Sequence, residues 1–105
     1  MNEEEVKFVV ALIDFLYDAG FLSKREQQYL KREIDIDGLT VPFWCCVDTI
    51  EENEVLLSPQ LQAGMDRFGS VIDEDDYQRV MQVQHAALEK ERKRREAVAA
   101  SIVFE

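Results

Sequence analysis

Two adjacent cysteines and one histidine are the residues of this 105-residue chain that could supply nucleophilic or metal chemistry. Cys45 and Cys46 are sequence neighbours, whereas zinc sites use separated ligand pairs, and neighbouring helical cysteines do not readily form a disulfide. A catalytic His85 would need a positioned nucleophile or carboxylate, and no sequence motif supplies one. Cysteine also packs well as a small core hydrophobe. We therefore expect a non-enzyme with no catalytic residue, metal ligand or cofactor.

The segment 33–38, with sequence EIDIDG, resembles the first half of a calcium-binding loop. In an EF-hand loop, glycine occupies the sixth position and a bidentate carboxylate the twelfth. With Gly38 at the sixth position, the twelfth is Trp44, which cannot bind calcium. Aspartate and glycine are also common in turns. We therefore interpret the segment as a turn after a helix that ends near Ile34, with a weak divalent-cation site as the alternative.

The net charge of −10 is concentrated in the middle of the chain, where residues 35–76 contain eleven acidic residues and one basic residue. Such a charge repels nucleic acids and anionic membranes and attracts basic partners. A basic helix after a short turn, at residues 23–34, superficially resembles a helix-turn-helix DNA reader. Because the acidic segment follows directly, an ordinary solvated helix face is the preferred interpretation. We expect no direct nucleic-acid binding, no membrane binding, and a protein partner with a basic surface.

The stretch Val6–Tyr17 has ten apolar residues among its twelve. Its polar line is narrow and contains Lys7, Asp14 and Asp18, with Ala11 between them. A helix that is apolar nearly all round must be covered on most sides. We therefore predict a central helix that runs from an Asn2 cap to a stop at Gly20.

Capping signals predict where the remaining helices begin. Serine or aspartate before a helical stretch caps its first turn, a Glu three residues later completes a capping box, and proline fits the first turn. Gly69 is expected to end the fourth helix. The predicted fold is all-α, a single compact domain of about five helices packed around the N-terminal helix, with a long C-terminal helix. The predicted starts are Ser23 with Glu26, Thr40 or Val41 with Pro42, Ser58 with Pro59, and Asp73.

The C-terminal helix carries an apolar stripe that ends near Leu88 and is followed by the charged run EKERKRRE. We expect residues 1–88 to form the core and residues 89–105 a charged helical extension with an apolar tail. The charged run either projects into solvent or pairs with the acidic middle. The tail either folds back, engages a partner, or forms a homodimer through residues 77–105. The stripe consists of Tyr77, Val80, Met81, Gln84, Ala87 and Leu88.

The longest uninterrupted apolar run, Phe8–Ile13, has six residues, whereas a membrane-spanning helix needs about twenty. The N-terminal segment MNEEEVK is acidic, whereas a signal peptide begins with basic residues. The cysteines provide no disulfide framework, which is typical of a reducing compartment. We therefore expect a cytoplasmic protein, or one that is delivered inside another cell.

Trp44 is the residue that most suggests a binding function. Helical spacing places it beside Asp48 and Glu51, where it is either the edge of the core or an exposed aromatic anchor, and tryptophan is enriched at interface hot spots. The first hypothesis is a small acidic helical regulator or inhibitor that acts by protein–protein contact. Its expected partner-binding residues are Trp44, Asp48, Glu51, Glu52 and Glu54, with a second contact from Ile102 and Phe104.

Two other functions remain open from the sequence. The spaced carboxylates could imitate phosphates, as in an acidic nucleic-acid mimic of phage or mobile-element type that blocks a nucleic-acid-binding protein. A homodimeric structural or assembly factor is the other alternative, because closed twofold dimers are the commonest oligomers. The carboxylates of the mimic would be Asp35, Asp37, Asp48, Glu51, Glu52, Glu54, Asp66 and Asp73–Asp76.

Overall fold

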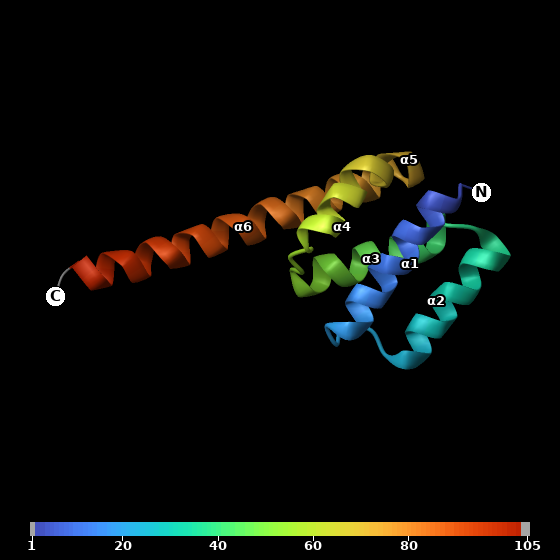
Figure 1. Cartoon of the computed structure of the whole chain (residues 1–105), viewed down its shortest axis with the longest axis horizontal. Helices are drawn as coiled ribbons and strands as arrows, with labels where there is room; N and C mark the ends of the chain where they lie inside the picture. The colour runs from blue at the N-terminus through green and yellow to red at the C-terminus, as the bar shows by residue number, and fades with distance from the viewer. Residues whose placement is uncertain (1, 104–105) are drawn as a thin grey trace.

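Every regular element of the computed structural model, which describes residues 2–103 and side chains as far as Ala100, is a helix (Figure 1). The last three short elements before the C-terminal helix follow one another without a break and form one bent segment. Counted in this way, residues 2–103 form the five helices predicted, in one compact all-α domain with a long C-terminal helix. The elements are α1 (Glu3–Asp18), α2 (Lys24–Asp37), α3 (Thr40–Asn53), α4 (Pro59–Gly64), the π-helical turn η1 (Met65–Gly69), α5 (Ser70–Ile72) and α6 (Glu74–Val103).

Helix α1 lies in the middle of the body, as its composition predicts. It contacts α2, α3 and α4, and its narrow polar line, with Lys7, Ala11 and Asp18, is exposed. Helix α6 packs chiefly on α3, so α1 and α3 share the central position. One hydrophobic core joins the buried faces of α1 and α3 and includes Val80 of α6. The fully buried side chains of α1 are Val9, Leu12, Ile13 and Leu16.

Four of the predicted helix starts are confirmed by their capping hydrogen bonds, and α3 begins at Thr40, as predicted, without a side-chain cap. The Asn2 side chain accepts from the Glu4 N–H at 2.8 Å, and Ser23 and Glu26 form the reciprocal capping box at 3.1 and 2.9 Å. Side-chain acceptors satisfy N–H groups that the first turn of a helix leaves free. Pro42 lies in the first turn of α3, where an N–H is not needed. The remaining two caps are Ser58 to Leu61, at 3.3 Å, and Asp73 to Asp76, at 3.0 Å.

The end of α2 differs from the prediction. The helix continues past Ile34 to Asp37 and is ended by Gly38, whose φ of +92° is accessible mainly to glycine. The N–H of Gly38 bonds to the Ile34 carbonyl at 3.2 Å. The interpretation of residues 33–37 as a turn was therefore wrong, because the glycine cap outweighs the weak helix preference of aspartate. Residues 2–103 contain no group of three or more His, Cys, Asp or Glu side chains arranged to hold a metal ion.

Gly69 does not end the fourth helix, contrary to the prediction. The chain continues through η1 into α5, and the right-handed backbone at Gly64 and Gly69 would suit any residue. Both glycines instead permit close packing. A Cβ atom at Gly64 would lie 2.6 Å from Cδ1 of Phe8, and one at Gly69 would lie 2.7 Å from Cδ1 of Tyr77. These glycines bring the bent segment against α1 and α6.

Replacing Gly64 with alanine is expected to destabilise the protein by about 1–3 kcal/mol, because the added methyl group collides with the buried Phe8 ring. The cost should exceed the gain in helix propensity, which is about 1 kcal/mol. Urea unfolding followed by circular dichroism measures the change. In the Phe8→Leu background, the penalty of Gly64→Ala should shrink, since the ring that it meets is gone. A stabilising Gly64→Ala substitution would contradict this packing argument.

Helix α6 leaves the body part-way along its length and projects as a straight arm (Figure 1). The molecule accordingly measures 60 × 27 × 19 Å along its principal axes. Most of the arm is exposed to solvent, and Lys90 pairs with Glu54 at 3.1 Å. The charged run therefore projects into solvent and also makes an ion pair with the acidic segment 35–76. Within the described part of the chain, none of the helices has the length and apolar character needed to cross a membrane.

Candidate protein-binding surface

Trp44 is half exposed on the first turns of α3, with 49% of its surface accessible. The structure therefore shows an aromatic side chain that is accessible at the edge of the body. Val41, one turn earlier, is exposed beside it. Both residues line a shallow groove between α3 and the start of α6. The other lining residues are Thr40, Asp73, Asp75 and Asp76.

The core fixes the position of Trp44. The opposite face of α3 is fully buried, so the helix cannot rotate about its axis without exposing large apolar side chains. Successive helical residues are separated by about 100°, which places Trp44 at the rim when Phe43 points inward. The exposed tryptophan is therefore held on a rigid element. The buried residues of α3 are Pro42, Phe43, Cys46, Val47 and Ile50.

Aspartates at the start of α6 form the other wall of the groove. Asp73 caps the helix, and Asp76 is only 7% exposed. Burial raises the pKa of Asp76, the charge of Asp73 raises it further, and the hydrogen bond from Arg79 offsets part of this rise. Asp75 is exposed. The groove thus combines an apolar, aromatic wall with an acidic wall. We name the residues Val41, Trp44, Asp73, Asp75 and Asp76 the Trp44 surface.

Arg79 of α6 joins three carboxylates from two helices. Its guanidinium lies 2.6 Å from Asp48, 3.1 Å from Glu51 and 3.0 Å from Asp76. The hydrogen bond from Arg79 lowers the pKa of Glu51, and the carboxylates raise that of Arg79. Asp48 and Glu51, predicted to contact a partner, are therefore engaged in an ion-pair cluster that holds α3 against α6. This cluster borders the Trp44 surface through Asp76.

The other predicted partner-binding residues lie apart from this groove. Glu54 follows the last turn of α3 and pairs with Lys90 of the arm, and Glu52 is exposed on α3. Ile102 belongs to α6, but its side chain lies outside the described part of the chain, as does Phe104 altogether. The structure thus brings Trp44 together with aspartates of α6 that the first hypothesis did not include.

Substituting Glu51 with glutamine is expected to lower the free energy of unfolding at pH 7, with a loss that disappears in acid. The pKa of Glu51 is lowered in the folded protein, so its stabilising effect is present above the unfolded pKa, about 4.5, and is lost as pH falls through the folded pKa. Urea unfolding of both proteins between pH 7 and pH 3 measures this difference. The control is Glu52→Gln, which removes the same charge at an exposed position. A Glu51→Gln difference that stays constant with pH would contradict the role assigned to Arg79.

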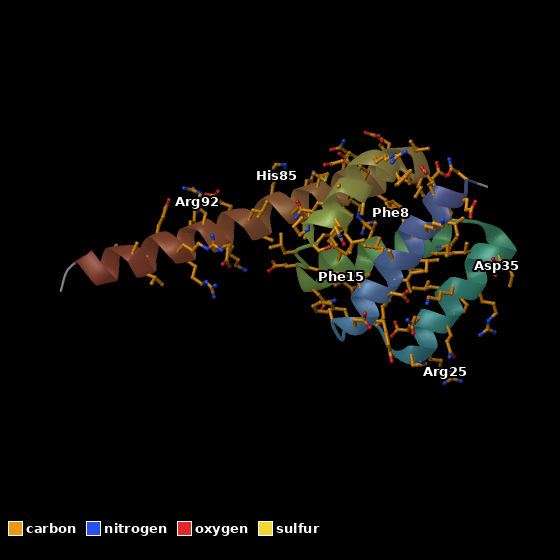
Figure 2. All side chains as sticks on the ribbon, viewed as in Figure 1. Phe8, Phe15, Arg25, Asp35, His85 and Arg92 are labelled. Atoms are coloured by element: carbon orange, nitrogen blue, oxygen red, sulfur yellow. The ribbon has the colours of Figure 1, made fainter. Side chains whose placement is uncertain are left out.

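The two cysteines lie in surroundings that disfavour their thiolate forms. Cys46 is fully buried and Cys45 is partly buried. Burial raises the pKa of both thiols, and the charges of Asp48 and Glu33 raise that of Cys45 further. Reactive cysteines have lowered pKa values in electropositive surroundings. His85 is exposed on α6 (Figure 2). The environment of Cys46 is that of a small core hydrophobe.

Two polar residues of α6 have structural roles that sequence reasoning missed. Gln84, only 3% exposed, donates to the Val55 carbonyl and accepts from the Leu57 N–H, each at 2.8 Å. It thereby fixes the connector after α3 onto α6. A glutamine within an apolar stripe was the available signal for this role. Arg79 is the only basic residue between Arg67 and Lys90, and such isolation among acids could have indicated an internal ion pair.

Comparison of the chain with protein-family models, curated proteins and solved structures gives no match.

Proposed function

We propose that this protein is a small acidic regulator that binds another protein through the Trp44 surface. The observation that carries the proposal is the half-exposed Trp44, held on a rigid helix beside acidic side chains. Interface cores favour tryptophan, and their polar rims supply charge complementarity. Lysine or arginine on the partner would pair with Asp73 or Asp75 and stack on the indole ring. The expected partner therefore presents a basic and partly apolar surface.

The distribution of ion pairs favours this function over nucleic-acid mimicry. A mimic needs unpaired carboxylates that replace phosphates, whereas Asp48 and Glu51 form ion pairs with Arg79, and Glu54 forms one with Lys90. Asp66 accepts a hydrogen bond from the Tyr77 hydroxyl at 3.1 Å. An aromatic anchor contributes nothing to phosphate imitation. The acidic mimic remains the alternative proposal and makes a different prediction about salt.

A pull-down from host lysate tests the two proposals together. The tagged protein and its Trp44→Ala variant are used in parallel, washed at about 0.1 M and then about 1 M salt, and bound proteins are identified by mass spectrometry. A partner that survives high salt and is lost with Trp44→Ala supports the Trp44 surface, because salt screens exposed charges but not apolar contacts. A nucleic-acid-binding partner that salt releases equally from both baits supports the mimic. Ile36→Ala, which removes an exposed apolar side chain of α2, is the matched control.

A further inference from the structure

The face of α6 that packs into the body continues along the projecting arm, residues 88–100. Val80 and Gln84 are buried in the body, and Leu88, Glu91, Arg95 and Val98 follow at alternating spacings of four and three residues. This spacing keeps side chains on one helix face and is the repeat of a coiled coil. Leu88 and Val98 are 49% and 56% exposed. The arm thus presents two apolar side chains that flank an acid and a base.

We propose that a second copy of this chain covers this face. The two arms run antiparallel, and the twofold axis lies at the level of Lys93 along each arm. In this register, Leu88 packs against the partner's Val98, and Glu91 faces the partner's Arg95. The two remaining contacts are the same pairs related by the twofold axis. The interface therefore consists of a central ring of two glutamates and two arginines between two apolar layers. One surface is complementary to itself, as a twofold dimer requires.

Ion pairs within each arm already place the charges for this ring. Glu91 lies 3.1 Å from Arg94 and 3.4 Å from Arg95 of its own helix, and its side chain is the least exposed of the charged groups on the arm. In the dimer, each Glu91 would lie between its own Arg95 and the partner's Arg95. Arg92 approaches the partner's Arg92 beside the ring, but it is paired with Glu89 and Glu96 of its own helix.

Charge also selects the antiparallel orientation. Parallel arms in the same register would place Glu91 against the partner's Glu91 and Arg95 against the partner's Arg95. They would also bring the two acidic segments, residues 35–76, side by side. Antiparallel arms keep these segments at opposite ends, because Leu88 of one arm and the partner's Leu88 lie about ten residues apart along the axis, or roughly 15 Å at 1.5 Å per residue. This separation exceeds the Debye length of about 8 Å at physiological salt.

The junction of arm and body provides room for the tip of the second arm. Leu56 of the connector is 43% exposed, and it lines a groove along the arm together with Leu88, Glu91, Arg95 and Ala99. The register that pairs Leu88 with the partner's Val98 brings that valine to Leu56 as well. The interface is short, and its area falls below that of a standard stable complex. We therefore expect dimerisation that depends on protein concentration.

Sedimentation equilibrium of the full chain tests the proposal through charge reversal. The parent should change from monomer to dimer mass as concentration rises. Glu91→Arg alone creates a ring of four arginines and Arg95→Glu alone a ring of four glutamates, so each should raise the dissociation constant about tenfold or more. An equimolar mixture of the two variants restores both opposite-charge contacts between the chains and should dimerise again. The matched control is Lys93→Glu, which makes the same charge change as Arg95→Glu on the opposite face and should dimerise like the parent.

A disulfide cross-link tests the register independently. In a Cys45→Ser background, a mixture of Leu88→Cys and Val98→Cys chains should form a covalent heterodimer on mild oxidation. Circular dichroism establishes that each variant retains its helix content. Cross-linking between two Leu88→Cys chains, without the heterodimer, would overturn the antiparallel register. A monomer mass for the parent at every concentration up to about 1 mM would overturn the dimer itself.

Discussion

Truncation of Trp44 to alanine is expected to weaken partner binding by about 30-fold or more, which corresponds to the loss of about 2 kcal/mol typical of an interface hot spot. The same substitution should change the free energy of unfolding much less than removal of a buried aromatic residue, because half of the indole is exposed in the free protein. Isothermal titration calorimetry with the captured partner measures the binding change, and urea unfolding measures stability. Together these measurements separate an interface residue from a core residue.

Charge variants at the same surface show how the aromatic anchor and the acidic wall share the binding energy. Asp75→Asn removes one exposed carboxylate and should weaken binding mainly through a slower association rate at low salt. Ile36→Ala removes an apolar group of comparable exposure from α2 and should leave affinity unchanged. If Trp44→Ala and Ile36→Ala have equal affinity for the partner, the Trp44 surface is not the binding site.

Gln84→Ala should have the largest effect on stability of any single substitution considered for α6. The substitution leaves two buried backbone groups, the Val55 carbonyl and the Leu57 N–H, without the hydrogen bonds that the Gln84 side chain makes to them. An unsatisfied buried polar group costs about 1–3 kcal/mol, so we expect a loss of about 2–4 kcal/mol in the free energy of unfolding. Chemical denaturation of the parent and the variant measures this loss.

Two further variants separate the hydrogen bonds of Gln84 from its helix propensity and its packing. Gln82→Ala, at an exposed position on the same helix, should be nearly neutral. Gln84→Glu keeps an acceptor for Leu57 but loses the donor to Val55, and it places a carboxylate at a buried position, so it should also be strongly destabilising. Equal stability of the parent and Gln84→Ala would mean that the connector does not depend on this side chain.

Local signals in the sequence were sufficient for most of the fold. The caps at Asn2 and Ser23 depend on residues within one helical turn, and the apolar pattern of Val6–Tyr17 reports burial directly. The errors at Gly38 and Gly69 have a common origin. The surrounding structure decides whether a glycine ends a helix or allows close packing within one. Gly38 adopts a positive φ and ends α2, whereas Gly69 packs against Tyr77 within a helical backbone.

The candidate surface was less predictable because its parts are distant in sequence. Helical spacing placed Trp44 beside Asp48 and Glu51, but it could not show that Arg79, roughly thirty residues later, would pair with both. Nor could it place Asp75 and Asp76 across a groove from the indole ring. Such relations follow from the packing of α6 on α3, which a one-dimensional pattern does not specify. The tryptophan itself was identifiable from residue type and periodicity alone.

The projecting arm of α6 has a consequence for the hydrodynamic behaviour of the protein. A compact chain of this length has a radius of gyration of about 13 Å, whereas that of this protein is 16.0 Å. A monomer should therefore elute from a gel-filtration column ahead of globular standards of equal mass. Its small-angle scattering should give an asymmetric distance distribution with a tail toward 60 Å, the longest dimension of the molecule.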